Sequence, residues 1–188
     1  MSHAADVTAY KQATTDTGID GILHVPHDRN LTDAVIQQIK TNGQFVTPTL
    51  AIFAAALHRP NPAIIHTSAR PTVIYNTRAL YRAGIPLLAG TDTVGPIAPE
   101  VSIPYGATLH QELGSFVETI GMTPEEATNA ATADAAKYHK LDDRGVIREG
   151  MRTDLLLLGS NPLEDIKNTR DVAADWVGGR KYPGPSMV

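Results

Sequence analysis

The stretch Ala83-Gly84-Ile85-Pro86-Leu87-Leu88-Ala89-Gly90-Thr91-Asp92 decides the fold that the sequence predicts. Its apolar run, Ile85–Ala89, is short and has glycines on both sides, which is typical of a buried strand. Asp92 follows the run after Gly90 and Thr91. In parallel α/β folds, functional residues lie just beyond the carboxyl ends of the strands. The stretch therefore predicts a buried parallel strand with a functional carboxylate at its end, although such a turn also serves commonly as a helix N-cap.

Two further strand patterns precede this stretch, and helical patterns separate them. Ile19–His24 ends shortly before a proline, and Gln44–Thr47 is followed directly by Pro48. Apolar residues between the two runs repeat at helical spacing, and a further helical pattern begins at Pro71 and stops at Gly84. This alternation predicts an α/β fold with parallel strands joined by right-handed crossovers.

The chain changes character after its last two predicted helices. Leu109–Ile120 stops at a glycine, and Thr123 with Glu126 forms a capping box for a helix running to about Tyr138. Turns and short apolar runs follow, which indicate antiparallel β structure. We expect an α/β region over residues 1–141, a small β segment over 142–182 and a loose tail over 183–188. Residues 51–67 and 93–107 show no pattern that we can assign, and we expect them to be loops.

Composition excludes several classes of function. The chain has 188 residues, is 42% hydrophobic and carries a net charge of −4 without a basic run, which argues against nucleic acid and anionic membranes as partners. It has no cysteine, so disulfides, thiol catalysis and cysteine-ligated zinc are excluded. The N-terminus lacks a signal-peptide pattern and no apolar run could span a bilayer, so we expect a cytoplasmic protein.

Three side chains at predicted strand ends carry the strongest chemical signal. His24 ends one strand pattern, Asp92 follows another, and His3 precedes the first helical pattern. Imidazole and carboxylate groups together are typical ligands of zinc or manganese. A lone histidine at a strand end is more often solvated, and His110 with Glu112 also fits a simple pair on a helix surface. The sequence has no phosphate-binding loop and no nucleophile elbow.

Together these blocks resemble the second half of the amidohydrolase superfamily. The opening stretch is similar to that family's eighth strand, Phe45–Leu50 to its seventh, and Trp176–Arg180 to its last strand. Further similar blocks are Leu109–Leu113, Gly121–Ala127, Asn129–Thr132, Asp143–Leu158 and Asn161–Leu163. The order and spacing of these blocks are specific, and they extend over nearly the whole chain.

The resemblance implies a fold, an activity and a set of ligands. The expected fold is α/β, a partial (β/α) TIM-type barrel of about strands 5 to 8 with a small C-terminal β segment. The implied activity is metal-dependent hydrolysis of C–N bonds (amide, lactam or cyclic amide) or related acyl bonds in a small molecule. His3, His24 and Asp92 match the ligands of strands five, six and eight, and Asp92 is also the implied catalytic base. His110 and Glu112 would support these ligands. The implied cofactor is a divalent metal, with zinc favoured over manganese or iron.

The sequence also departs from the family pattern. The His-x-His pair of strand one and the bridging residue of strand four have no counterpart. One alternative is therefore an inactive half-barrel that acts as an interaction module, and another is a doubly wound α/β binding domain. An open parallel sheet exposes two edges. We expect that two copies associate as a homo-oligomer or that a complementing half-barrel covers them.

Overall fold

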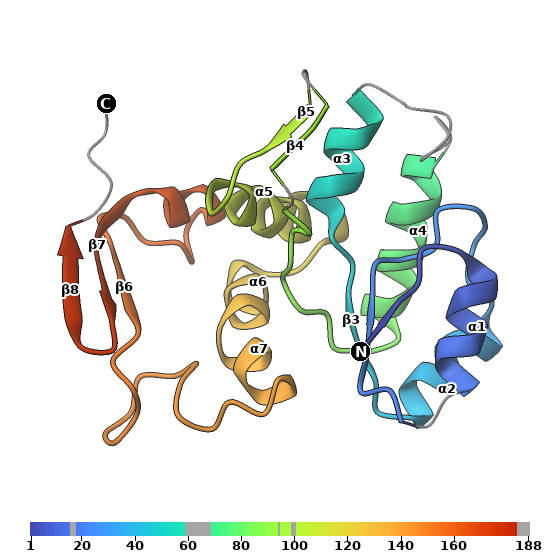
Figure 1. Ribbon diagram of the computed structural model, residues 1–188, viewed down its shortest axis with the longest axis horizontal. Helices are drawn as coiled ribbons and strands as arrows, with labels where there is room; N and C mark the ends of the chain where they lie inside the picture. The colour runs from blue at the N-terminus through green and yellow to red at the C-terminus, as the bar shows by residue number, and fades with distance from the viewer. Residues whose placement is uncertain (16–17, 59–68, 94, 99–100, 184–188) are drawn as a thin grey trace.

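The computed structural model describes residues 1–15, 18–58, 69–93, 95–98 and 101–183 (Figure 1). The strands are β1 (Ser2–His3), β2 (Gly21–Leu23), β3 (Phe45–Thr47), β4 (Gly95–Ala98), β5 (Val101–Ile103), β6 (Leu155–Leu158), β7 (Val172–Val177) and β8 (Arg180–Pro183). The helices are α1 (Val7–Thr15), α2 (Asp33–Thr41), α3 (Leu50–His58), α4 (Ala69–Arg82), α5 (Ala107–Ser115), α6 (Pro124–Ala131) and α7 (Ala133–Tyr138). A π-helical turn, η1 (Phe116–Ile120), and a 3₁₀ turn, η2 (Ile166–Arg170), complete the elements.

The first three strands form a parallel sheet in chain order, β1-β2-β3. Ile22 pairs with Val46, and Val46 makes a parallel bridge to Leu87. The predicted strand Ile85–Ala89 therefore joins the sheet through one bridge instead of a full ladder. Pro86 has no N–H to donate, and the Ala89 amide donates to the Ala130 carbonyl of α6, 3.0 Å away. Ala89, the last residue of the predicted strand, is therefore bonded to helix α6 and not to a neighbouring strand.

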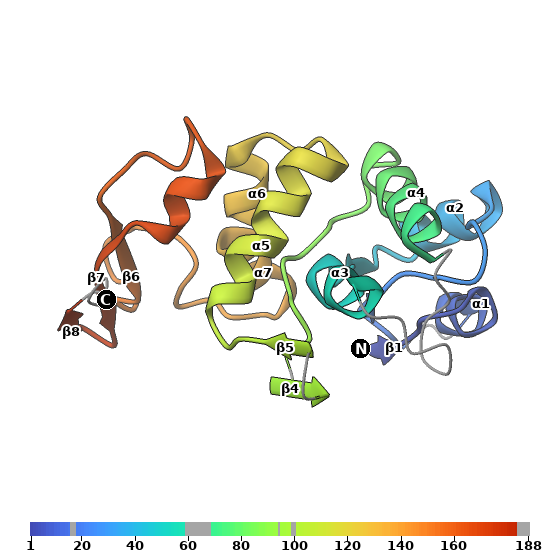
Figure 2. The same ribbon diagram turned by 90° about the horizontal axis from the view of Figure 1, so that it is seen from above.

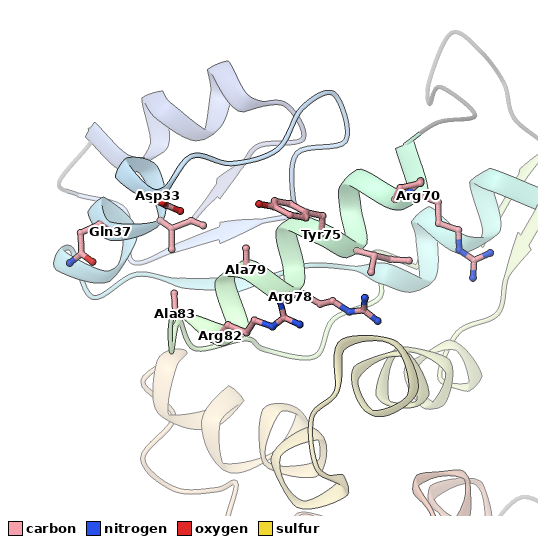
Figure 3. Close-up of a pocket in the computed structure, with 11 residues that line it drawn as sticks. Asp33, Gln37, Arg70, Tyr75, Arg78, Ala79, Arg82 and Ala83 are labelled. Atoms are coloured by element: carbon pink, nitrogen blue, oxygen red, sulfur yellow. The ribbon is translucent and has the colours of Figure 1, made fainter.

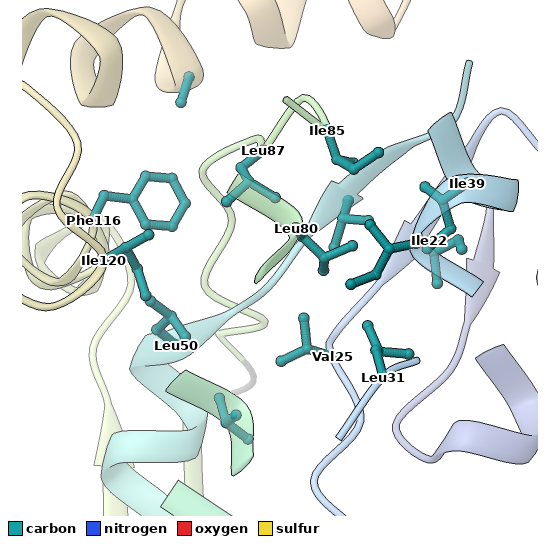
Figure 4. Packing of buried hydrophobic residues seen from close by; sticks show 14 of the residues in the cluster. Ile22, Val25, Leu31, Ile39, Leu50, Leu80, Ile85, Leu87, Phe116 and Ile120 are labelled. Carbon is teal, nitrogen blue, oxygen red and sulfur yellow. The ribbon is translucent and has the colours of Figure 1, made fainter. Parts of the chain in front are cut away.

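The core lies between this sheet and the helices that follow its strands (Figure 4). Ile22, Val46, Ile39 and Leu80 are fully buried where β2 and β3 meet α2 and α4. Each such side chain contributes about 1.5–3 kcal/mol when it is removed from water. Phe116 is also fully buried, and the figure shows it beside Ile120 and Leu87. The core is therefore continuous from the sheet to the later helices.

Several predicted boundaries need correction. The capping box of Thr123 and Glu126 is present, but the helix that it begins does not run unbroken to Tyr138. It stops at Thr132, whose φ of −129° is not helical, and α7 starts anew. Residues 51–67 are not simply a loop, because α3 occupies their first part with an alanine-rich apolar sequence. The expected loop over 93–107 contains the antiparallel pair β4–β5. Residues 59–68, 94 and 99–100 of these two segments lie outside the described residues.

The C-terminal β segment lies at the end of the molecule remote from α1 and α2 (Figures 1 and 2). Its antiparallel order is β6-β7-β8, so β7 is the central strand. The sequence did not predict β8, which returns after the glycine turn at 178–179 and takes up residues 180–183. Residues 184–188 of the expected loose tail lie outside the described residues. Leu156 and Leu157 are 54% and 50% exposed, which is unusual for a leucine strand.

Across the part of the chain that is described, we find no helix with the length and apolar character that crossing a membrane requires.

Gly21 provides a test of the sheet packing. It lies opposite Phe45 in the β2–β3 ladder, and a Cβ built at Gly21 would clash with three carbon atoms at the far end of the Phe45 ring. That ring cannot swing away freely, because Tyr138 and His139 pack against it with centroids 5.5 Å apart. We expect Gly21→Ala to lower the free energy of unfolding by about 1–3 kcal/mol, as overpacking does elsewhere.

The matched control is Gly114→Ala. Gly114 lies in α5, and a Cβ there would meet no atom within 4 Å. Alanine in a helix is more favourable than glycine, so this variant should be unchanged or more stable by up to about 1 kcal/mol. Urea denaturation followed by circular dichroism measures both variants. Equal stability of the two would show that Phe45 is not fixed over β2.

Candidate metal site

The carboxyl ends of the parallel strands bring three predicted ligands together. His3 is the last residue of β1, His24 follows β2 directly, and Asp92 follows the segment that bridges to β3. Each side chain offers one ligand atom, and these three atoms all lie within 4.8 Å of one another. Within the described residues, this is the one group of three or more such side chains with that spacing. Residues that are 89 positions apart in sequence thus meet at one edge of the sheet.

His24 is held on every side. Its backbone N–H donates to the Thr47 carbonyl over 2.8 Å, and its carbonyl accepts from the Tyr10 hydroxyl over 2.7 Å. Its ring Nδ1 lies 2.6 Å from Thr49 Oγ1. Its Nε2 lies 2.6 Å from His3 Nε2 and 3.7 Å from Asp92 Oδ2. With one ring nitrogen engaged behind it, the buried imidazole directs the other toward the two remaining groups.

The electrostatics of the cluster favour a cation. Burial lowers the pKa of His24, His3 lowers it further, and Asp92 opposes the shift. A neutral imidazole is the form that binds a metal ion. Two ring nitrogens that face each other beside a carboxylate are a donor set suited to a divalent transition metal such as zinc or manganese. The residues present therefore fit the cofactor that the sequence predicted.

Backbone strain is concentrated at this site. Among the described residues, four other than glycine have a positive φ, and three of these are His24, Thr49 and Asp92. A positive φ costs a residue with a side chain about 1–2 kcal/mol, and it is unusual for a β-branched residue such as threonine. Such strain persists only where the surrounding structure enforces it, and it is common at functional sites.

Glu112 contacts the start of helix α3, and its described hydrogen bonds do not go to the three clustered side chains. It is fully buried on α5, and its two carboxylate oxygens accept the backbone N–H groups of Leu50 and Ala51 over 2.9 and 2.7 Å. These groups belong to the first turn of α3, where a helix favours negative charge. Burial raises the pKa of Glu112 to about 8, and the two hydrogen bonds partly offset this effect. Its contact is therefore with the segment after β3, next to Thr49.

His110 faces away from Glu112 on the same helix. Its Nδ1 lies 3.0 Å from Thr169 Oγ1 in η2. Burial, together with the nearby Arg170, lowers the pKa of His110. The structure thus places His110 at the junction of α5 with the C-terminal segment, and its described hydrogen bond goes to that segment and not to the three clustered ligands.

Sequence reasoning missed three residues around the cluster. Thr49 contacts His24, and its only sequence signal was its place after the strand and Pro48. Asn76 is buried on α4 and ties down the loop after His24, since it accepts from the Leu31 N–H and donates to the carbonyls of Pro26 and Arg29. Phe53 of α3 packs its ring 5.9 Å from that of His24. These contacts join distant segments, so spacing along the chain does not reveal them.

The fold and the cluster define an α/β protein with a His/Asp site at the carboxyl edge of a parallel sheet. A family model described as the amidohydrolase family matches residues 4–180, and the chain belongs to this family.

Individual relatives agree with this assignment. The chain is 39% identical over 111 residues to ochratoxinase from Aspergillus niger, which is 56% of this chain and 21% of that protein. It is 31% identical over 140 residues to imidazolonepropionase from Cutibacterium acnes, which is 74% of this chain and 30% of that one. The crystal structure of A. niger ochratoxinase superposes with a TM-score of 0.77 at 26% identity, over 99% of this chain and 42% of that chain. A Xaa-Pro dipeptidase gives 0.78 at 25% identity, over 97% of this chain and 44% of that chain. The chain therefore spans less than half the length of these relatives.

The raised pKa of Glu112 predicts a pH dependence of stability. A carboxyl whose pKa is higher in the folded state keeps its proton there while the unfolded chain has lost its own, so its contribution falls as pH rises from about 4.5 to about 8. Glu112→Gln is neutral at every pH and lacks this loss. We expect the stability of the wild type relative to the Gln variant to fall between pH 5 and pH 8.5. Urea unfolding of both chains across this range measures it, and a constant difference would contradict it.

Proposed function

We propose that this protein is part of a metal-dependent hydrolase that cleaves C–N bonds (amide, lactam or cyclic amide) or related acyl bonds in small molecules. The observation that carries the proposal is the convergence of His3, His24 and Asp92, with their ligand atoms within 4.8 Å of one another. Membership of the amidohydrolase family supports the reaction class. The retained cluster favours an enzyme over the alternative of an inactive interaction module.

We also propose that the sheet is the second half of a (β/α) barrel. Its strands are parallel and adjacent in chain order, as in a singly wound barrel, whereas a doubly wound sheet reverses its order. Helices α1, α2 and α4 connect or follow the strands, which is the arrangement of repeated βα units. The site residues lie at the carboxyl ends, where barrel enzymes place their chemistry. The strands of the chain thus correspond to about strands 5 to 8.

The three clustered residues would have two roles in hydrolysis, metal binding and proton transfer. His3, His24 and Asp92 would hold the divalent ion, zinc being favoured by two imidazoles and a carboxylate. When bound, such an ion supplies an activated water and polarises the substrate carbonyl. Asp92 accepts the proton of the attacking water and returns it to the leaving nitrogen as the C–N bond breaks. The side chain of Asp92 is 36% exposed and open to substrate, while buried His24 keeps its ring fixed.

The relatives support the substrate class without defining one substrate. They are named ochratoxinase, imidazolonepropionase and Xaa-Pro dipeptidase, and the last name denotes a substrate joined by a peptide bond. Small molecules with a hydrolysable C–N bond are therefore the first compounds to screen.

Metal content tests the site directly. We expect the purified chain, dialysed against zinc and then against buffer, to retain close to one equivalent of zinc by elemental analysis. Asp92→Ala should lose most of it, because a carboxylate ligand is removed. Asp142→Ala is the matched control, since Asp142 is an exposed aspartate in the turn after α7. Zinc retained equally by all three chains would count against the assignment.

Activity tests the role of Asp92 in proton transfer. Asp92→Asn keeps the size of the side chain but cannot accept the proton, so amide hydrolysis by the zinc-loaded chain should fall by about 100-fold or more. Steady-state assays on a panel of N-acyl amino acids and cyclic amides measure this change. Unchanged turnover in the Asn variant would sink the assignment of Asp92 as the base.

We propose that a second copy or a complementing half-barrel covers the open edges of the chain. Among the described strands, β1 is the edge of the parallel sheet. In the C-terminal β segment, Leu156 and Leu157 of β6 are about half exposed. Burying this surface is favourable, because apolar area is removed from water. Sedimentation velocity should show a species larger than 20.1 kDa at micromolar concentration, and a monomer at all concentrations would contradict self-association.

A further inference from the structure

We propose that Thr49 is a positioning residue that fixes the orientation and the tautomer of the His24 ring, and that Glu112 holds Thr49 in place through the first turn of α3. The consequence for metal affinity rests on the proposed function. The positioning itself is a property of the chain alone and can be measured without metal.

The first step concerns the His24 ring. Its Nδ1 is 2.6 Å from the hydroxyl oxygen of Thr49, and its Nε2 faces His3 and Asp92. A neutral imidazole has one protonated and one free nitrogen. If Nδ1–H donates to the threonine hydroxyl, the lone pair of Nε2 is directed into the cluster. A hydrogen-bond partner on the ring nitrogen that does not bind the metal commonly sets the tautomer of a metal-binding histidine. This partner is usually a carboxylate or a carbonyl, and here it is a hydroxyl.

The second step concerns the backbone of Thr49. Its φ of 56° lies in the left-handed region, which a β-branched residue rarely adopts. The threonine hydroxyl meets His24 only while this conformation is held. On one side, the Thr47 carbonyl is fixed by the His24 N–H. On the other side, the next two backbone N–H groups, of Leu50 and Ala51, are bound by Glu112.

The third step concerns how Glu112 holds Thr49 from a distant part of the chain. Glu112 comes from α5, 63 positions beyond Thr49 in the chain, and its side chain is fully buried. Glu112→Gln would keep one acceptor oxygen and replace the other by an NH2 donor, so one of the two backbone N–H groups next to Thr49 would lose its partner. The segment that opposes the strain at Thr49 would then be held less firmly. Glu112 therefore acts on His24 through Thr49, without touching the metal ligands. A simple helix cap would stabilise α3 but would leave the His24 ring unchanged.

The experiment follows the His24 ring by ¹⁵N NMR in the metal-free full chain at pH 8, together with zinc affinity by calorimetry. We expect the wild type to carry its proton on Nδ1. Thr49→Val removes the hydroxyl but keeps the shape, so the Nδ1–H form should give way to Nε2–H, and zinc should bind about 10-fold more weakly or worse. Thr49→Ser should restore both within about threefold. Thr128→Val, a threonine of α6 that bonds the Pro124 carbonyl, is the control and should change neither.

Glu112→Gln decides the second half of the proposal. We expect it to shift the His24 tautomer in the same direction as Thr49→Val while the chain remains folded by circular dichroism. A Gln variant that melts earlier but keeps the wild-type tautomer would overturn the role of Glu112 and leave it a helix cap. An unchanged tautomer in Thr49→Val would overturn the role of Thr49. A wild-type chain with Nδ1–H but without zinc affinity would refute the proposed function and uphold the positioning.

Discussion

The pairing of β2 with β3, in the register that places Ile22 beside Val46, is the constraint on which the rest of the structure depends. Val46 then bridges to Leu87, so three segments end at the same edge of the sheet. Because side chains alternate across a strand, a shift of one residue would turn His24 toward the opposite face and separate it from Asp92. The buried side chains of α2 and α4 hold this register from behind, since Ile39 and Leu80 are fully enclosed against it.

The site is built from turns that would not hold their shape alone. His24, Thr49 and Asp92 all have left-handed backbones, and the first two are stabilised by groups far away in sequence. Tyr10 binds the carbonyl of His24 from α1, and Glu112 binds the segment after Thr49 from α5. The core therefore does more than stabilise the fold, because it also maintains the arrangement of these three residues against their local backbone preferences.

The sequence predicted what depends on local pattern and missed what depends on distant contacts. Apolar runs bounded by glycine and proline located β2 and β3, and Thr123 with Glu126 located the start of α6. The strand expected over residues 85–89 shrank to one bridge, because Pro86 cannot donate and Ala89 turns to α6. The sequence singled out His3, His24 and Asp92 because each lies at a predicted strand end, and strand ends converge in this class of fold. The sequence did not predict the contact of Thr49 with His24, because that contact depends on a strained backbone and on a carboxylate 63 positions away.

Among the described residues, the C-terminal sheet has two edges without a strand partner, β6 and β8, and the two edges differ in character. β8 presents Arg180 and Lys181, and positive charges on an edge discourage pairing with another strand. β6 is four consecutive leucines with no charge to repel a neighbour. An edge contact through β6 uses the same surface on both copies, so it has twofold symmetry and closes at two molecules. Since the charged β8 edge disfavours pairing, an assembly formed through this sheet would stop at two copies and would not grow into open-ended fibres.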